Sequence, residues 1–276
     1  MLDYARGIND HYGSTDLCAR IVAAVRAAGL DPATVTRDDL APFDEFHTGG
    51  RESTRELARL AGVHDGQLVL DVGSGIGGPA RTLAAEFGCR VTGLDLTEEF
   101  CRAAELLTGW VGISDRVSFR HGNALHVPFD EASFDIVWSQ NSMMNIEDKA
   151  ALFREVRRVL RPGGLFAFDV VAAGPVPRVR FPTFWAPGPA LNFLATPDAL
   201  RSLLEEAGFR VRDWQDQTAA RLESARRRRA PSAGPAPVLG RDVIVAEDVP
   251  LKIENSVRNT EEGHTVAVRA IAVRPA

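Results

Sequence analysis

Three glycines and one carboxylate form the part of this chain that is best placed for chemistry. The stretch LVLDVGSGIGGPARTLA begins at Leu68, and its glycines Gly73, Gly75 and Gly78 have the G-x-G-x-x-G spacing of a nucleotide-binding loop. Asp71 stands just before the first glycine. A pyrophosphate would be repelled by that carboxylate, whereas a nucleoside with a cationic tail would not be. A tight strand-to-helix turn without any ligand is the alternative for the glycines alone.

A second acid follows the next apolar segment. RVTGLDL places Asp95 where a carboxylate can accept hydrogen bonds from both hydroxyls of a ribose. Nicotinamide cofactors use the same position, but Asp71 opposes their pyrophosphate. S-adenosylmethionine, which is a nucleoside with a cationic amino-acid tail, is compatible with both acids.

Five ordered segments carry a family resemblance. VLDVGSGIGGPARTLA, GLDL, GNALHVPF, FDIVWSQNSMMNIEDKAALFREVRRVLRPGG and LEEAGF resemble the successive motifs of class I S-adenosylmethionine-dependent methyltransferases, over about residues 55 to 215. FHTGGREST, ahead of them, is similar to the small-molecule group that includes sarcosine/dimethylglycine, sterol and phosphoethanolamine methyltransferases. The resemblance implies S-adenosyl-L-methionine as cofactor and transfer of its methyl group to a small molecule by in-line displacement.

The resemblance also implies a cofactor site, in which Asp71 and the first glycines cradle the methionine part, Asp95 binds the ribose and Gln140 lies beneath the sulfur. Asn123 stands where many members have an acid that accepts from the adenine amino group, and its amide oxygen can still accept that bond. The cofactor-binding residues expected are Asp71, Gly73, Ser74, Gly75, Asp95, Leu96, Asn123, Ala124 and Gln140.

The acceptor side departs from the family pattern. Relatives often have an acid after the glutamine and a histidine four residues later, whereas this chain has Asn141 and Asn145. A substrate base carried by that histidine would be absent. Aromatic residues follow in a Pro-rich segment, where they line an apolar acceptor pocket or pack beneath a lid. The substrate-binding residues expected are Asn141, Met144, Asn145, Phe184 and Trp185.

Candidates for a base or an orienting group are His47, Asp169 and Tyr12. Methyl transfer from a sulfonium needs a base only where the acceptor must lose a proton. His47 lies in the family-like FHTGGR, with a hydrogen-bonded structural role as its alternative. Asp169 ends an apolar strand, where an acid is costly unless it is paired or used. Tyr12 would close over the methionine end or anchor the first helix.

Composition limits the partners. The 276 residues carry a formal net charge of −5, which argues against nucleic acid as partner. Three cysteines without C-x-x-C spacing indicate reduced thiols and neither a disulfide framework nor a zinc site, and no metal is expected. No apolar run reaches the length of a membrane span, so we expect a soluble, cytoplasmic protein without a membrane partner. The oligomeric state is left open.

The elements that must position these residues alternate as strand and helix. This order predicts an α/β fold with a Rossmann-like, seven-stranded, mostly parallel sheet and helices on both faces. Residues 1–50 would form an N-terminal helical cover, and residues 51–276 the catalytic domain. Insertions at about 172–196 and 219–262 would form a lid over the acceptor.

The sequence therefore predicts a methyltransferase whose acceptor is an apolar or heteroaromatic specialised metabolite, such as an isoprenoid intermediate. A protein that binds S-adenosylmethionine without transferring its methyl group is one alternative. A nucleic-acid methyltransferase is another, which the acidic balance and the absence of an Asn/Asp-Pro-Pro-aromatic motif oppose. Whether N, O or C is methylated is left open.

Overall fold

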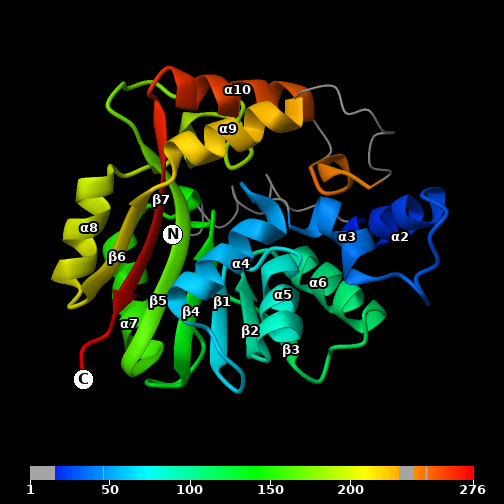
Figure 1. Cartoon of the computed structure of the whole chain (residues 1–276), viewed down its shortest axis with the longest axis horizontal. Helices are drawn as coiled ribbons and strands as arrows, with labels where there is room; N and C mark the ends of the chain where they lie inside the picture. The colour runs from blue at the N-terminus through cyan, green and yellow to red at the C-terminus, as the bar shows by residue number, and fades with distance from the viewer. Residues whose placement is uncertain (1–15, 46, 230–238, 246–247) are drawn as a thin grey trace.

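The computed structural model describes residues 16–45, 47–229, 239–245 and 248–276. Its centre is a seven-stranded sheet in the order β3-β2-β1-β4-β5-β7-β6 (Figure 1). Adjacent strands are parallel from β3 to β5, and β7 is antiparallel to both of its neighbours. The strands are β1 (Leu68–Val72), β2 (Arg90–Asp95), β3 (Val117–His121), β4 (Phe134–Gln140), β5 (Leu160–Ala173), β6 (Arg210–Asp216) and β7 (Thr265–Val273). The predicted fold class is confirmed.

The central strands are buried on both faces, as a parallel sheet between helices requires. β4 buries every residue except Asp135, and alternate residues of the strands face different apolar clusters. Leu70 and Val72 face the cluster that contains α7 (Lys149–Val159) and α8 (Pro197–Glu206). Val69 faces the cluster of α4 (Gly50–Ala61) and α5 (Gly78–Phe87). Because strand side chains alternate, Asp71 also lies on the α4 and α5 face.

A third apolar cluster joins the N-terminal helices to the rest of the molecule. It combines α2 (Leu17–Ala27) and α3 (Arg37–Asp44) with α6 (Glu98–Trp110). The sequence analysis predicted a helical cover over residues 1–50 but did not place α3 within it. Its missed signal is Thr36, whose hydroxyl accepts from the backbone N–H of Asp39 while the Asp39 carboxylate accepts from that of Thr36. Such a capping box satisfies two otherwise unpaired donors and starts a helix.

Two further element boundaries depend on local sequence. Thr196 caps α8, accepting from the backbone N–H of Ala199 at 3.2 Å, with Pro197 in the first position. The segment RPGG lies within β5, which begins at Leu160. The pairing of Phe134 with Leu160 explains the longer strand, and the register shifts between Phe134 and Ile136.

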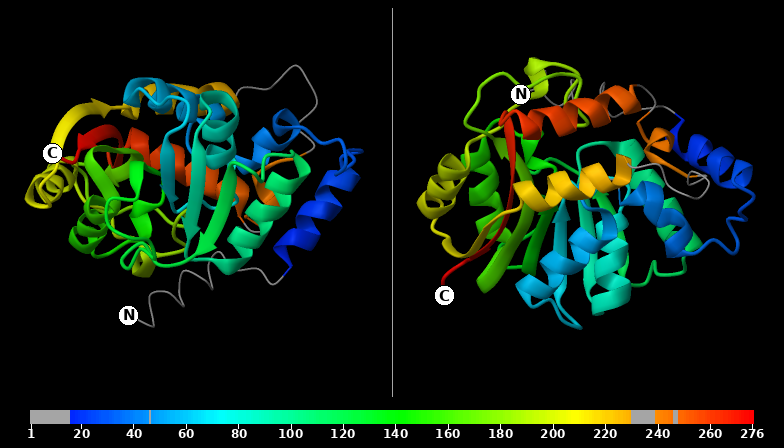
Figure 2. Two further views of the ribbon diagram at one scale, coloured as in Figure 1. Left: turned by 90° about the horizontal axis from the view of Figure 1, so that it is seen from below. Right: turned by 45° about the horizontal axis from the view of Figure 1, so that its top comes forward.

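The expected excursion before the last strand contains two helices. α9 (Thr218–Arg229) and α10 (Val249–Glu261) lie side by side across the end of the sheet at which β1 and β4 finish (Figures 1 and 2). Within the described residues, none of the helices is both long and apolar enough for a membrane span. Parallel sheets bind ligands at the carboxyl ends of their strands, so α9 and α10 cover the edge where a ligand is expected.

Candidate functional site

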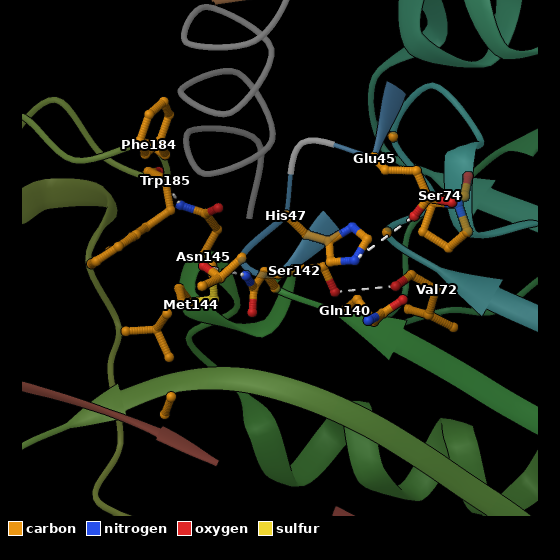
Figure 3. A pocket seen from close by; sticks show the side chains of 18 of the residues that line it. Glu45, His47, Val72, Ser74, Gln140, Ser142, Met144, Asn145, Phe184 and Trp185 are labelled. Atoms are coloured by element: carbon orange, nitrogen blue, oxygen red, sulfur yellow. Dashed lines mark hydrogen bonds and ion pairs between the residues drawn. The ribbon is translucent and has the colours of Figure 1, made fainter. Parts of the chain in front are cut away.

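A cavity of about 610 Å³ lies between the carboxyl ends of the strands and the α9–α10 pair. Glu45, His47 and Ser74 lie around one part of it, and Asn145, Phe184 and Trp185 around another (Figure 3). We call these parts the glycine-loop side and the acceptor side.

The glycine loop follows β1 and approaches Ser142, which stands just after β4. Gly73 has a φ of 73°, and a Cβ at this position would lie 2.2 Å from the Cβ of Ser142. The Ser142 hydroxyl donates to the carbonyl of Val72 at 3.1 Å (Figure 3). A side chain at Gly73 would therefore require both a strained backbone and the displacement of Ser142.

Asp71 lies near the end of β1 with 1% of its surface exposed, and it is not among the described residues that line the cavity, although Val72 and Gly73 after it are. Its Oδ2 atom has no hydrogen-bond partner in the described part of the chain. Burial, reinforced by the charges of Asp95 and Glu45, raises the pKa of Asp71 to about 8. Ser74 lines the cavity, and its buried hydroxyl is likewise without a partner among the described residues. Buried polar atoms are normally satisfied, so these two indicate a ligand.

Asp95 is held by the backbone where β2 ends. Its Oδ2 accepts from the N–H of Gly75 at 2.8 Å, and its Oδ1 accepts from the N–H of Thr97 at 2.9 Å. The carboxylate lines the cavity together with Leu96, Asn123 and Ala124. The Asn123 side-chain oxygen accepts from the N–H of Leu125 at 2.9 Å, which fixes its orientation.

Gln140 lines the cavity at the end of β4, and both ends of its amide are engaged. Oε1 accepts from Trp138 Nε1 at 3.0 Å and from the Thr54 hydroxyl at 2.9 Å. Nε2 donates to Asp169 Oδ2 at 3.2 Å. The amide is therefore held in one orientation from three different elements.

Asp169 is not among the described residues that line the cavity. It is fully buried, 2.9 Å from Arg269 Nε and 2.8 Å from Arg221 Nη2, and it accepts from the Ser53 hydroxyl at 2.8 Å. Burial raises the pKa of this carboxyl, but the two arginines outweigh that effect and lower the pKa to about 2. This arrangement does not favour the expected role as a base, because the group holds its proton too weakly.

His47 lines the cavity and is largely buried. Its Nε2 lies 3.0 Å from the carbonyl of Gly50, 3.3 Å from the Thr54 hydroxyl and 3.8 Å from Glu45 Oε2. The carbonyl can only accept, so Nε2 donates to it. Tyr12 lies outside the described residues.

Glu45 lines the cavity, although the sequence analysis did not include it among the candidate site residues. Its carboxyl is buried and accepts from the Thr82 hydroxyl. Its Oε2 lies 3.0 Å from the Thr54 hydroxyl, whose single proton can be donated either to Glu45 or to Gln140. Burial and the neighbouring Asp44 raise its pKa to about 7. The only signal in the sequence is the acid two residues before His47, within the segment expected to form an N-terminal helical cover.

The five residues expected to bind the acceptor all line the cavity. Asn145 Nδ2 donates to the carbonyls of Trp185 at 2.6 Å and Leu191 at 3.0 Å, and Trp185 Nε1 donates to the side chain of Asn192 at 2.7 Å. These hydrogen bonds of Asn145 connect the chain after β4 to the Pro-rich segment at about residues 172–196, which carries the aromatic side chains of the acceptor wall.

The rest of the acceptor wall is formed by the α9–α10 pair and β7. None of the residues of this part was predicted from the sequence. Arg221 reaches Asp169 and the carbonyl of Thr48, so it links α9 to the sheet and to the loop before α4. The carboxyl groups found among the described lining residues are Asp44, Glu45 and Asp95, which lie on the glycine-loop side. The lining residues contributed by this wall are Thr218, Arg221, Leu222, Ala225, Ile253, Ser256, Val257, Thr260, Thr265, Val266 and Ala267.

In the described ranges, no group of three or more His, Cys, Asp or Glu side chains is placed so that it could bind a metal ion. The cysteines Cys18, Cys89 and Cys101 are free thiols.

Comparison with known proteins agrees with this geometry. Residues 70–168 match the family model described as "Methyltransferase domain". O-methyltransferase resE of Aspergillus sclerotiorum is 31% identical over 65% of this chain and 68% of that protein. Methyltransferase GfsG of Streptomyces halstedii is 37% identical, but over only 49% of each chain, so the match spans about half of that relative.

A solved structure extends the likeness to the fold. Haemonchus contortus phosphoethanolamine N-methyltransferase 2, in complex with phosphomonomethylethanolamine and S-adenosylhomocysteine, superimposes with a TM-score of 0.71 at 20% identity. The superposition covers 99% of this chain and 61% of the other.

Proposed function

Since the chain belongs to the class I S-adenosylmethionine-dependent methyltransferase family, we propose that it transfers the methyl group of S-adenosyl-L-methionine to a small-molecule acceptor. The family resemblance read from the motifs is confirmed. The observation that carries the proposal is the pair of buried, unpartnered polar atoms, Asp71 Oδ2 and Ser74 Oγ, beside a glycine loop that opens on the cavity.

The residues at the glycine-loop side fit this cofactor. Asp71 and Ser74 offer an acceptor and a hydroxyl to the methionine part, and the glycines let the backbone approach it closely. Asp95 retains acceptor capacity for ribose hydroxyls, since each oxygen uses one lone pair on a backbone N–H. Leu96, Asn123 and Ala124 supply the wall for the adenine.

When bound, the cofactor supplies an activated methyl group and a neutral leaving group. The chain's residues then have to orient the acceptor and exclude water. Gln140 presents a fixed amide to the cavity between the two sides. The α9–α10 pair and the Pro-rich segment enclose the acceptor.

We assign a fairly apolar acceptor, such as an oxygenated or heteroaromatic specialised metabolite. The acceptor wall presents Val171, Phe184, Trp185, Leu222, Ile253 and Val257. Its hydroxyls are mostly engaged within the protein: Ser256 donates to the carbonyl of Lys252 and Thr260 to that of Ser256. Without a carboxylate on the described part of this wall, a cationic acceptor would have no anionic partner there.

His47 is the residue we propose as orienting group or base for an acceptor that must lose a proton. It lies on the cavity wall, whereas Asp169 lies behind it with a lowered pKa. Since Nε2 donates to Gly50, the neutral ring would use Nδ1 as its acceptor.

The test is incubation with methyl-deuterated S-adenosylmethionine and a panel of phenols, polyketide alcohols, indoles, amines and prenyl diphosphates, followed by mass spectrometry. The proposal expects a deuterated methyl group on an uncharged, apolar member of the panel and an equal amount of S-adenosylhomocysteine. Conversion of an acceptor without incorporation of the label would contradict it. Fragmentation of the product would show whether N, O or C carries the methyl group.

A further inference from the structure

Arg221 of α9 lines the acceptor side of the cavity, and 11% of its side chain is exposed. Its Nη2 lies 2.8 Å from Asp169 Oδ2, and its Nη1 donates to the carbonyl of Thr48 at 2.5 Å. A planar guanidinium serves two acceptors at once in fixed directions. Arg221 therefore fixes the loop before α4, which contains Thr48, relative to β5, which contains Asp169.

Asn141, directly after β4, contacts the same two residues. Its backbone N–H donates to the carbonyl of Asp169 at 2.8 Å, and its Nδ2 donates to the Thr48 hydroxyl at 3.2 Å. Arg221, Asp169, Asn141 and Thr48 thus form a closed ring of contacts, which we call the Arg221 ring. The members come from α9, β5, the chain after β4 and the loop before α4. A displacement of Arg221 therefore reaches Asn141 through both of its partners.

The backbone of Asn141 has a conformation that needs such support. Its φ of 53° lies in the left-handed region, which a residue other than glycine keeps only where its surroundings fix it. Asn141 lines the cavity, and its buried Oδ1 has no hydrogen-bond partner in the part of the chain that the structure describes. Because buried polar atoms are normally satisfied, this oxygen indicates a hydrogen-bond donor on a ligand.

Building on the proposed function, we infer that Arg221 is a positioning residue. Acting through Thr48 and Asp169, it holds Asn141 where the amide oxygen of Asn141 accepts a hydrogen bond from the methyl acceptor. The acceptor class that fits is an apolar molecule with a hydroxyl or an N–H group, such as an alcohol, a phenol or an indole. The α9–α10 pair thereby sets the position of a polar group in the cavity wall as well as closing the cavity.

Other contacts keep the fold in place without Arg221. Asp169 retains its ion pair with Arg269, whose Nε lies 2.9 Å from Asp169 Oδ1. The start of α9 stays attached to β7, because the Thr218 hydroxyl accepts from the N–H of Ala267 at 3.0 Å. Substitution of Arg221 should therefore act on the ring without detaching the helix.

The experiment measures methyl transfer from methyl-deuterated S-adenosylmethionine to the panel of compounds named above, using the compound that the wild type methylates fastest. We expect Arg221→Gln to raise the KM for that compound about tenfold, while the affinity for S-adenosylhomocysteine changes less than twofold. Arg226→Gln is the matched control, because Arg226 lies on the same helix, is exposed and pairs with Glu261. It should leave both constants unchanged. An unchanged KM in Arg221→Gln overturns the inference.

A double substitution distinguishes positioning from a general structural role. If Arg221 acts through Asn141, Arg221→Gln should raise the KM no more than about twofold further in an Asn141→Ala background. The factors of the two single substitutions would multiply if Arg221 acted elsewhere, and that result contradicts the inference.

Arg221→Lys guards against a variant that fails to fold. Its ammonium keeps a positive charge beside Asp169, but it lacks the planar fork that also reaches Thr48. We expect a melting temperature close to that of the wild type and a KM raised as in Arg221→Gln. A wild-type KM would show that only the charge of Arg221 matters, and the positioning role would be wrong.

Hydrogen exchange in the protein without ligands tests the ring without any acceptor. The backbone N–H of Asn141 should exchange faster in Arg221→Gln and Arg221→Lys than in the wild type and Arg226→Gln. Equal exchange in all four proteins overturns the inference, whatever the acceptor is. Absence of transfer to every compound by the wild type overturns the proposed function, and exchange alone then decides whether Arg221 positions Asn141.

Discussion

Asp71 and Asp169 are two buried aspartates on strands of the same sheet, and their surroundings shift their pKa values in opposite directions. Asp169 has two arginines and a hydroxyl around it, and its pKa falls to about 2. Asp71 has one oxygen without a partner among the described residues, and its pKa rises to about 8. The satisfied acid is tied to other elements of the fold, whereas the other acid keeps an unpartnered oxygen on the strand that leads into the glycine loop. Burial alone does not distinguish these two roles, but the partners do.

The largest effect that this comparison predicts is on stability. Asp169→Asn removes the charge that faces Arg221 and Arg269, so we expect a loss of about 3–5 kcal/mol in the free energy of unfolding. Denaturant unfolding at pH 7 measures it. A loss as small as that of Asp130→Asn, an exposed loop acid, would show that the buried pairs contribute nothing.

The pH dependence of that effect follows from the sign of the shift. Asp169 has a folded pKa below its unfolded value of about 3.9, so its contribution is present above pH 4 and is lost as the pH falls toward 2. The stability difference between wild type and Asp169→Asn should therefore shrink over that range. A difference that stays constant from pH 5 to pH 2 would contradict the ion-pair account.

Asp71→Ala should weaken the binding of S-adenosylmethionine about a hundredfold, which corresponds to about 2–3 kcal/mol for hydrogen bonds to a charged group. Asp130→Ala is the control, because its side chain is exposed and lies in the loop after β3. Calorimetric dissociation constants provide the measurement. Equal effects of the two substitutions would remove Asp71 from the cofactor site.

In the protein without cofactor, Asp71→Asn should increase the free energy of unfolding, whereas Asp169→Asn should decrease it. A carboxyl whose folded pKa is raised destabilises the fold as the pH rises from about 4 toward 8, because its charge must be buried. At pH 8 the amide should raise stability by about 1 kcal/mol, or the melting temperature by roughly 2–4 °C. A melting temperature lower than that of the wild type would show that the Asp71 charge is compensated in the folded protein.

The smallest predicted effect concerns the acceptor wall. Asn145→Ala removes the donors to the carbonyls of Trp185 and Leu191, so the Pro-rich segment should lose its fixed position. We expect the KM for the acceptor to rise about fivefold, or ~1 kcal/mol, while cofactor affinity changes less than twofold. A change in cofactor affinity with an unchanged KM for the acceptor would contradict the assignment of Asn145 to the acceptor side.

The sequence signals of the glycine-loop side are local. Asp71 and Asp95 lie at or near the ends of buried strands and Gly73 follows one, and parallel strands bring such ends to one edge of the sheet. The partners of Asp169 could not be read in this way, since Arg221 and Arg269 lie on α9 and β7, far along the chain. Glu45 was missed for the same reason, because its burial depends on packing between α4 and α5.

The acceptor side shows where the sequence provides too little information. Phe184 and Trp185 were expected to line a pocket, and they do. The opposite wall, from Thr218 to Ala267, comes from helices whose apolar faces could have packed on any surface. Only the tertiary arrangement shows that these faces close over the carboxyl ends of the strands.

The most direct test of the central claim is parallel titration of the wild-type protein with S-adenosylmethionine and with NAD⁺. The account predicts saturable binding of one S-adenosylmethionine per chain, displaced by S-adenosylhomocysteine, and no binding of NAD⁺, because the buried Asp71 repels a pyrophosphate and accepts a cation. Binding of NAD⁺ without S-adenosylmethionine would contradict it.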